Sequence, residues 1–303
     1  MLQFKARVGK IGYLFKVSFH AFMDDNVMKL SAALSYYTIF ALPPLLIIII
    51  SLAGIFFGEE AVRGQLFGQI HGLIGNESAM QIQEAIIQIK QSGMGTMATG
   101  ASLCILLVGA SGVFAEIQNS INFIWGVKAK PKRGFMKFIK NRLMSFSMIG
   151  AVGFLLMVGL IVNSVMDILS NKLTTYFSED FVILFYILNY AMVFLIITTL
   201  FTIIFRTLPD GKIALRDCVI GAAFTSMLFM AGRFAIGFYL GNSALGTIYG
   251  AAGSVILILV WVYYSAIILY FGAEFTKVYA ITHGNNIVPN EYTVKIIKEN
   301  IEI

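Results

Sequence analysis

Residues 30–57 read LSAALSYYTIFALPPLLIIIISLAGIFF, a stretch without a single charged side chain. About 20 mostly apolar residues suffice for a helix to cross a bilayer, so this stretch predicts a membrane-spanning helix. Pro43 and Pro44 lie in its middle, where each removes a backbone donor and crowds the preceding turn. We therefore expect the helix to kink or break there. Broken membrane helices are tolerated against protein or a water-filled cavity, so two interpretations stay open: a substrate path or a packing kink.

Five more apolar runs of similar length follow. Hydrophobic residues make up 58% of the 303 residues and charged residues 13%, against about 45–50% and about 25% in soluble domains. This composition excludes a soluble globular enzyme, a disordered chain and a nucleic-acid-binding module. It predicts an all-α membrane protein with six transmembrane helices, at Leu30–Phe57, Met97–Trp125, Leu143–Leu169, Phe181–Phe205, Ala214–Leu240 and Ile248–Phe275.

The basic residues predict the orientation of these helices. Eighteen of the 22 Lys and Arg residues fall before residue 30, in the loops after the second and fourth runs, or after residue 276. Three fall on the opposite side, and Arg233 lies inside a run. Because cytoplasmic loops carry the excess of Lys and Arg, both termini are predicted to be cytoplasmic. The basic loop at residues 128–142 would also attract anionic lipid headgroups.

The segments outside the membrane are short. Phe15, Phe19 and Phe22 recur at helical spacing, which predicts an amphipathic helix on the inner interface. The expected layout is a cytoplasmic N-terminal segment at 1–29, a six-span domain at 30–280 with an external helical cap at 58–96, and a cytoplasmic tail at 281–303.

Two ionisable residues lie well inside the predicted spans. Glu116 and Arg233 sit at similar depth, so we expect them to face the same interior region, where they could pair. Asn119 shares the polar face of Glu116. The alternatives are that Arg233 extends to the outer headgroups and that Glu116 is a hydrogen-bonded packing residue. Asp167, Asp217 and Glu274 lie near span ends, where solvation is accessible.

The sequence holds no signature of an enzyme. Its three histidines and two cysteines are far apart, so no metal site is expected. It contains neither GxxxxGK[ST] nor GxGxxG after a strand, so no nucleotide or other cofactor is expected.

Several strings resemble the YihY/BrkB family of bacterial inner-membrane proteins. The resemblance covers nearly all of residues 23–280, and it rests on Leu30–Thr38, Leu42–Leu45, Asn119–Trp125, Leu208–Asp210, Tyr249–Gly253, Trp261–Tyr263 and Phe271–Glu274. It implies a six-span protein of the bacterial inner membrane. Family members were once labelled ribonuclease BN, a label that nothing in this chain supports, and are associated with virulence, serum resistance and envelope lipid transport. The resemblance supplies no catalytic residue.

We therefore expect a transporter or flippase-like protein for a lipid or other amphiphile, without its own ATPase. The alternative is a non-catalytic scaffold of an envelope assembly. Expected partners are membrane lipids, with a second copy of the chain or an envelope protein left open, and no nucleic acid. The candidate positions for a substrate path are Tyr36, Tyr37, Pro43, Pro44, Glu116, Asn119, Arg233 and Glu274.

Overall fold

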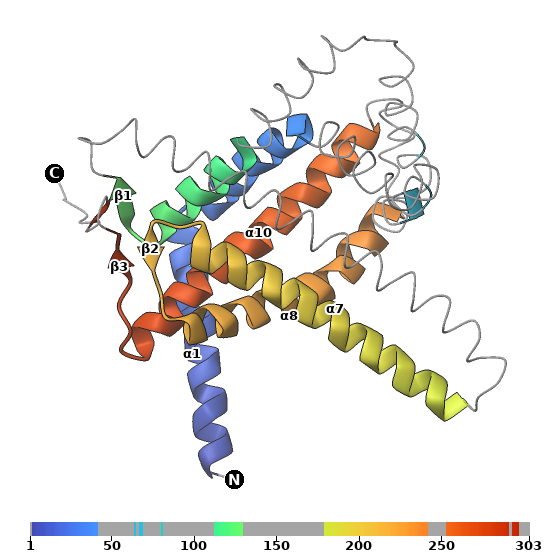
Figure 1. The fold of residues 1–303 in the computed structure, drawn as a ribbon, viewed down its shortest axis with the longest axis horizontal. Coiled ribbons are helices and arrows are strands. Elements are labelled where there is room, and N and C mark those ends of the chain that lie inside the picture. The colour runs from blue at the N-terminus through green and yellow to red at the C-terminus, as the bar shows by residue number, and fades with distance from the viewer. Residues whose placement is uncertain are drawn as a thin grey trace.

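Three long apolar helices dominate the structure (Figure 1). They are α7 (Glu179–Thr207), α8 (Leu215–Gly241) and α10 (Gly253–Thr282), and each has the length and hydropathy to cross a membrane. The computed structural model describes residues 2–41, 64, 67–68, 80, 112–129, 179–241, 253–290 and 293–296. Within these ranges the fold is that of a helical membrane protein.

The three helices coincide with the last three predicted spans, whose boundaries were 181–205, 214–240 and 248–275. Helical residues 27–41 overlap the first predicted span, and helical residues 112–124 fall within the second. The predicted break at Pro43 and Pro44, the external cap at 58–96 (apart from four isolated residues) and the third span lie outside the described residues.

Helix α10 occupies the centre of the described helices. Figure 1 shows it between α8 on one side and helical residues 112–124 and 27–41 on the other. In the most apolar window of each helix, 44% of α10 is buried, against 17% of α7. The outer face of α7 carries exposed apolar side chains such as Ile187 and Leu195, which suits contact with lipid tails.

A reciprocal contact between glycine and threonine joins α8 to α10. Gly221 on α8 faces Thr276, and Gly272 on α10 faces Thr225. A Cβ atom added at either glycine would lie 2.8 Å from the Cβ of the facing threonine. Each threonine hydroxyl donates a hydrogen bond to the carbonyl of the glycine on its own helix, at 2.7 Å. Small residues at this crossing allow the two backbones to approach closely.

The N-terminal helix α1 (Leu2–Asp24) packs against α10 and ends at a sharp turn. Asn26 adopts a left-handed conformation with φ of 51°, which separates α1 from the helix that starts at residue 27. In α1, Leu14, Ser18 and Phe22 are buried. The residues predicted to lie on the inner membrane interface were Phe15, Phe19 and Phe22. Phe15 and Phe19 are about half exposed. The predicted helix is present, and one side of it packs against α10.

Short strands join three distant segments at one end of the helices. Strand β1 (Val127–Ala129) pairs with β4 (Thr293–Lys295), and β2 (Gly211–Lys212) pairs with β3 (Val288–Pro289), both antiparallel. These strands belong to the loop after the second span, the loop after the fourth span and the tail. The three segments, which the charge pattern predicted to share one side, thus lie together.

Candidate functional site

A buried charged cluster lies at the end of the helices where these strands meet. Its centre is Lys277 on α10, whose Nζ donates hydrogen bonds to Glu274 Oε2 at 3.1 Å and to the carbonyl of Ile124 at 2.7 Å. The same Nζ lies 3.6 Å from Asp25 Oδ2. Glu274 is fully buried, and Asp25 is 7% exposed. Two carboxyl groups therefore share one ammonium group in a largely dry environment.

Local backbone geometry brings these groups together. The left-handed turn at Asn26 follows Asp25 directly and directs the chain into the next helix. The helix of residues 112–124 ends at Trp125 and Gly126, and Gly126 has a φ of +66°. The last carbonyls of a helix lack partners within it, and a cation near them is favourable. Lys277 fills this role for Ile124.

Glu274 and Asp217 differ from the sequence expectation of solvated side chains. Glu274 has no exposed surface and Asp217 is 2% exposed. Asp217 accepts a hydrogen bond from Asn285 Nδ2 at 2.8 Å. Both carboxyl groups lie near span ends as expected, but the turn at Asp25 lies against Glu274 and the segment after α10 lies against Asp217. The expectation was wrong because these segments carry no pattern that places them over the helix ends.

A pocket of about 200 Å³ lies beside the cluster. It combines charged groups with apolar side chains contributed by the turn after α1, the end of residues 112–124, α10 and the tail. Ile281 and Lys295 are exposed, so the pocket opens to the surface. Its lining consists of Asp25, Ile124, Trp125, Gly126, Lys277, Ile281, Ile287, Lys295 and Ile296.

Asp210 organises the neighbouring loop. Its carboxylate accepts hydrogen bonds from Asn122 Nδ2 at 2.9 Å and from Gln118 Nε2 at 3.4 Å. Its backbone N–H donates to Asn122 Oδ1 at 2.8 Å. Sequence reasoning did not single out this group. The sequence pattern that could have indicated it is the pair of amide side chains at positions 118 and 122, which lie on one helix face.

Replacing Asn122 by Ala should destabilise the protein by about 1–3 kcal/mol, because the buried backbone donor of Asp210 and its carboxylate both lose a partner. The measurement is unfolding of purified protein in detergent, followed by circular dichroism. Asn119→Ala is the matched control, since Asn119 is exposed on the same helix. Equal effects of the two substitutions would contradict the role of Asn122.

The other candidate positions that the structure describes differ in how far they are buried. Glu116 is half-buried and accepts a hydrogen bond from Ser120 Oγ at 3.3 Å, and Tyr37 lies 3.6 Å from a Cβ built at Gly112, one turn before Glu116. Arg233 is exposed on α8, and among the described residues it forms no ion pair with Glu116. Tyr36, Tyr37 and Asn119 are also exposed.

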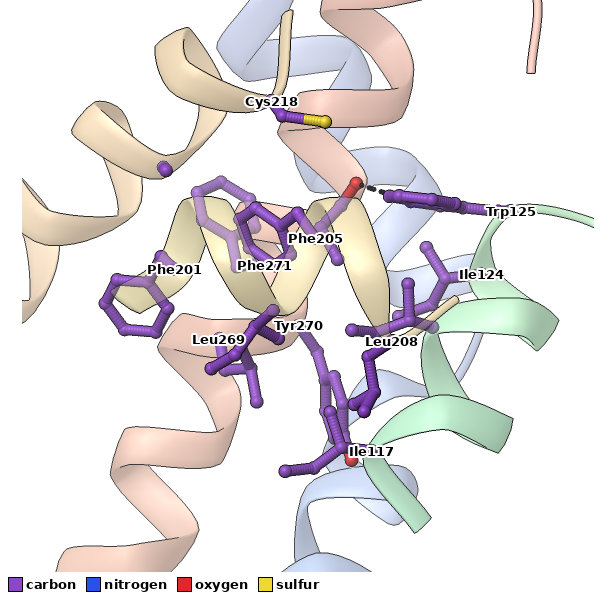
Figure 2. Packing of buried hydrophobic residues seen from close by; sticks show 14 of the residues in the cluster. Ile117, Ile124, Trp125, Phe201, Phe205, Leu208, Cys218, Leu269, Tyr270 and Phe271 are labelled. Atoms are coloured by element: carbon purple, nitrogen blue, oxygen red, sulfur yellow. Dashed lines mark hydrogen bonds between the residues drawn. The ribbon is translucent and has the colours of Figure 1, made fainter. Parts of the chain in front are cut away.

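Helix α10 connects Glu116 with the charged cluster. Trp125 Nε1 donates to the carbonyl of Ala273 at 3.1 Å, drawn as a dashed line in Figure 2. Figure 2 also shows the Tyr270 side chain of α10 directed towards Ile117. Glu116 and Glu274 therefore lie along one helix interface, whereas Arg233 is not joined to them.

Comparison with known proteins gives the family. The family model described as "Virulence factor BrkB" matches residues 18–293. Among curated relatives, a UPF0761 membrane protein of Saccharophagus degradans is 28% identical over 276 residues, covering 91% of this chain and 61% of the relative. One from Alkalilimnicola ehrlichii is 28% identical, covering 86% and 56%, and one from Azotobacter vinelandii is 26% identical, covering 84% and 60%.

This chain thus spans about three fifths of the length of these relatives. No solved structure matches it. The match extends from within α1 to the β4 segment and includes every residue of the charged cluster. The chain belongs to the BrkB virulence-factor family and is an integral membrane protein.

Proposed function

We propose that this protein is a transporter that moves a lipid or another amphiphile, without an ATPase of its own. The observation that carries the proposal is the cluster of Asp25, Glu274 and Lys277 beside a mixed polar and apolar pocket. Glu116 lies inside the second predicted span, and ionisable residues inside spans commonly mark substrate or ion pathways. Isoleucine walls beside ammonium and carboxylate groups match a ligand that has both apolar and charged parts.

The proposal includes the topology expected from the charges. In it, six spans cross the bacterial cytoplasmic membrane, both termini are cytoplasmic, and an external helical cap covers residues 58–96. Its support is the meeting of two loops and the tail at one end through β1–β4 and β2–β3. With this orientation the pocket opens to the cytoplasm.

We also propose that anionic headgroups bind the basic loop at 128–142. Lys128 supports this, because its side chain is exposed on β1 at the same end as the pocket. A lipid held there by its headgroup would lie close to the pocket entrance.

The test is a scrambling assay in proteoliposomes that contain a fluorescent phospholipid and an impermeant quencher outside. Wild-type protein should expose inner-leaflet probe to the quencher, and Glu116→Gln and Glu274→Gln should each slow this by about tenfold, equivalent to about 1.4 kcal/mol in the barrier. Asp24→Asn is the matched control, since Asp24 is exposed and adjacent to Asp25.

Two results would contradict the proposal: wild-type vesicles that behave like protein-free vesicles, or full activity in both glutamine variants. The first would favour the scaffold of an envelope assembly instead.

A further inference from the structure

Polar side chains form a row on one face of α10. Tyr270, Glu274 and Lys277 follow at intervals of four and three residues, which places them on the same side of a helix. This side faces helical residues 112–124, because Trp125 contacts the carbonyl of Ala273 and Lys277 contacts that of Ile124. The row therefore lies between two helices and not towards lipid.

Two oxygen atoms in the row lack hydrogen-bond partners among the described residues. They are the Tyr270 hydroxyl and Glu274 Oε1, and both side chains are fully buried. Buried polar atoms nearly always have a protein or water partner. The two residues are one helical turn apart, about 6 Å along the axis, and buried oxygens without a protein partner are commonly met by ordered water. Phenylalanine in place of Tyr270 and leucine in place of Glu274 would fill similar space without leaving a buried oxygen unsatisfied, so packing alone does not account for the two polar groups.

The row continues inwards from Tyr270. The Tyr270 hydroxyl lies within electrostatic range of the Ser120 hydroxyl and the Glu116 carboxylate. Ser120 Oγ donates to Glu116 Oε1 at 3.3 Å. Four oxygen-bearing groups thus lead from Glu274 to a carboxylate deep in the second span.

The row also continues outwards to the surface pocket. The Glu274 carboxyl group interacts with the Asp25 carboxyl group and with the Lys277 ammonium group. Asp25 and Lys277 line the pocket, and the Lys277 side chain is 22% exposed. A proton from the surrounding water can therefore reach Glu274 through groups that already contact it.

We propose that this row is a proton path from the pocket to Glu116. Glu274 takes a proton on one carboxyl oxygen and releases one from the other. The Tyr270 hydroxyl accepts a proton through a bridging water and, after turning towards Ser120, passes its own proton to that hydroxyl, and the Ser120 hydroxyl protonates the Glu116 carboxylate. Glu274, Tyr270 and Ser120 each gain one proton and lose one, so their protonation is unchanged; Glu116 ends with the transferred proton, and no oxidant or reductant is needed.

The path would supply a driving force to a transporter that has no ATP-binding motif, and this use rests on the proposed function. The path itself does not. Ionisable chains of this kind within membrane helices are typical of proton relays. Among the described residues, the charged groups that act on Glu274 are Lys277 and Asp25, and the one that acts on Tyr270 is Glu116.

The decisive experiment follows hydrogen–deuterium exchange at Glu116 by infrared spectroscopy of the protein in lipid bilayers. The carbonyl band of protonated Glu116 is identified as the band missing in Glu116→Gln over a pH series. After rapid transfer into D₂O, this band should shift quickly in the wild type and about tenfold more slowly in Tyr270→Phe, a change of about 1.4 kcal/mol in the exchange barrier.

Tyr279→Phe provides a matched control. It makes the same substitution nine residues along α10, half a turn around the helix, where the tyrosine stacks on Phe275 and His283. Its exchange rate should equal that of the wild type. Glu274→Gln should slow exchange as Tyr270→Phe does.

Equal exchange rates in Tyr270→Phe and the wild type would overturn the path, and so would the absence of any band that Glu116→Gln removes. The readout is independent of cargo. Slow exchange in Tyr270→Phe together with no lipid scrambling in the wild type would leave the path standing and reject the proposed function. Lipid scrambling by the wild type, together with an exchange rate in Tyr270→Phe equal to that of the wild type, would support the proposed function and reject the path.

Discussion

Replacing Lys277 by Met should lower the free energy of unfolding by about 3–5 kcal/mol, because it leaves buried carboxyl groups without their cation. Lys277 contacts Glu274, Asp25 and the carbonyl of Ile124. Methionine keeps the length of the stem but offers no donor to any of the three oxygens. The measurement is unfolding of purified protein in mixed micelles with increasing SDS.

Two further variants identify the cause. Lys128→Met makes the same change at an exposed lysine and should alter stability by no more than about 0.5 kcal/mol. Adding Glu274→Gln to Lys277→Met removes one of the two uncompensated carboxyl groups and should restore a large part of the loss. An effect of Lys277→Met no larger than that of Lys128→Met would show that the ammonium does not hold the cluster together.

The second large effect is expected at the crossing of α8 and α10. Gly272→Ala places a methyl group against Thr225, with only 2.8 Å between the two Cβ atoms. The Cβ of Thr225 is bonded directly to the α8 backbone and cannot rotate away. The helices must therefore separate, and overpacking of this kind costs about 1–3 kcal/mol. Gly221→Ala should have the same effect through Thr276. The same SDS titration measures both.

The reciprocal geometry supplies a rescue. Combining Gly272→Ala with Thr225→Gly moves the larger residue from one helix to the other and should recover most of the loss, less about 1 kcal/mol for glycine in a helix. Gly12→Ala is the control, because nothing lies within 4 Å of a Cβ at Gly12, and it should be neutral or slightly stabilising. Loss of stability in Gly12→Ala equal to that in Gly272→Ala would contradict the packing explanation.

The helices of this fold follow from the sequence, but their packed faces do not. The apolar runs at 181–205, 214–240 and 248–275 predicted α7, α8 and α10 to within about seven residues at each end, because the hydrocarbon thickness fixes their length. In α1 the phenylalanine spacing predicted a helix correctly, but it did not indicate which side of that helix packs against the rest of the protein. That side is chosen by contact with α10, which lies about 250 residues away in the sequence.

The candidate site shows the same limit. Glu274 was predicted as a position of interest, yet as a solvated one. Its surroundings include Asp25, which the packing of α1 against α10 brings to it, and no periodic signal in the sequence specifies that contact. Glu116 was selected because a carboxyl group inside an apolar run is costly. Tyr270 was not selected, since a tyrosine in a membrane helix carries no such signal by itself.

The pairing of β1 with β4 has a consequence for biosynthesis. Ala129 pairs with Thr293, so the strand that closes this end of the bundle leaves the ribosome long after its partner. At about 5–20 residues per second, the interval is on the order of ten seconds or more. During that time Asp25 and the loop at Gly126 have no tail above them. The nascent protein therefore exposes this charged face until β4 has left the ribosome and paired with β1.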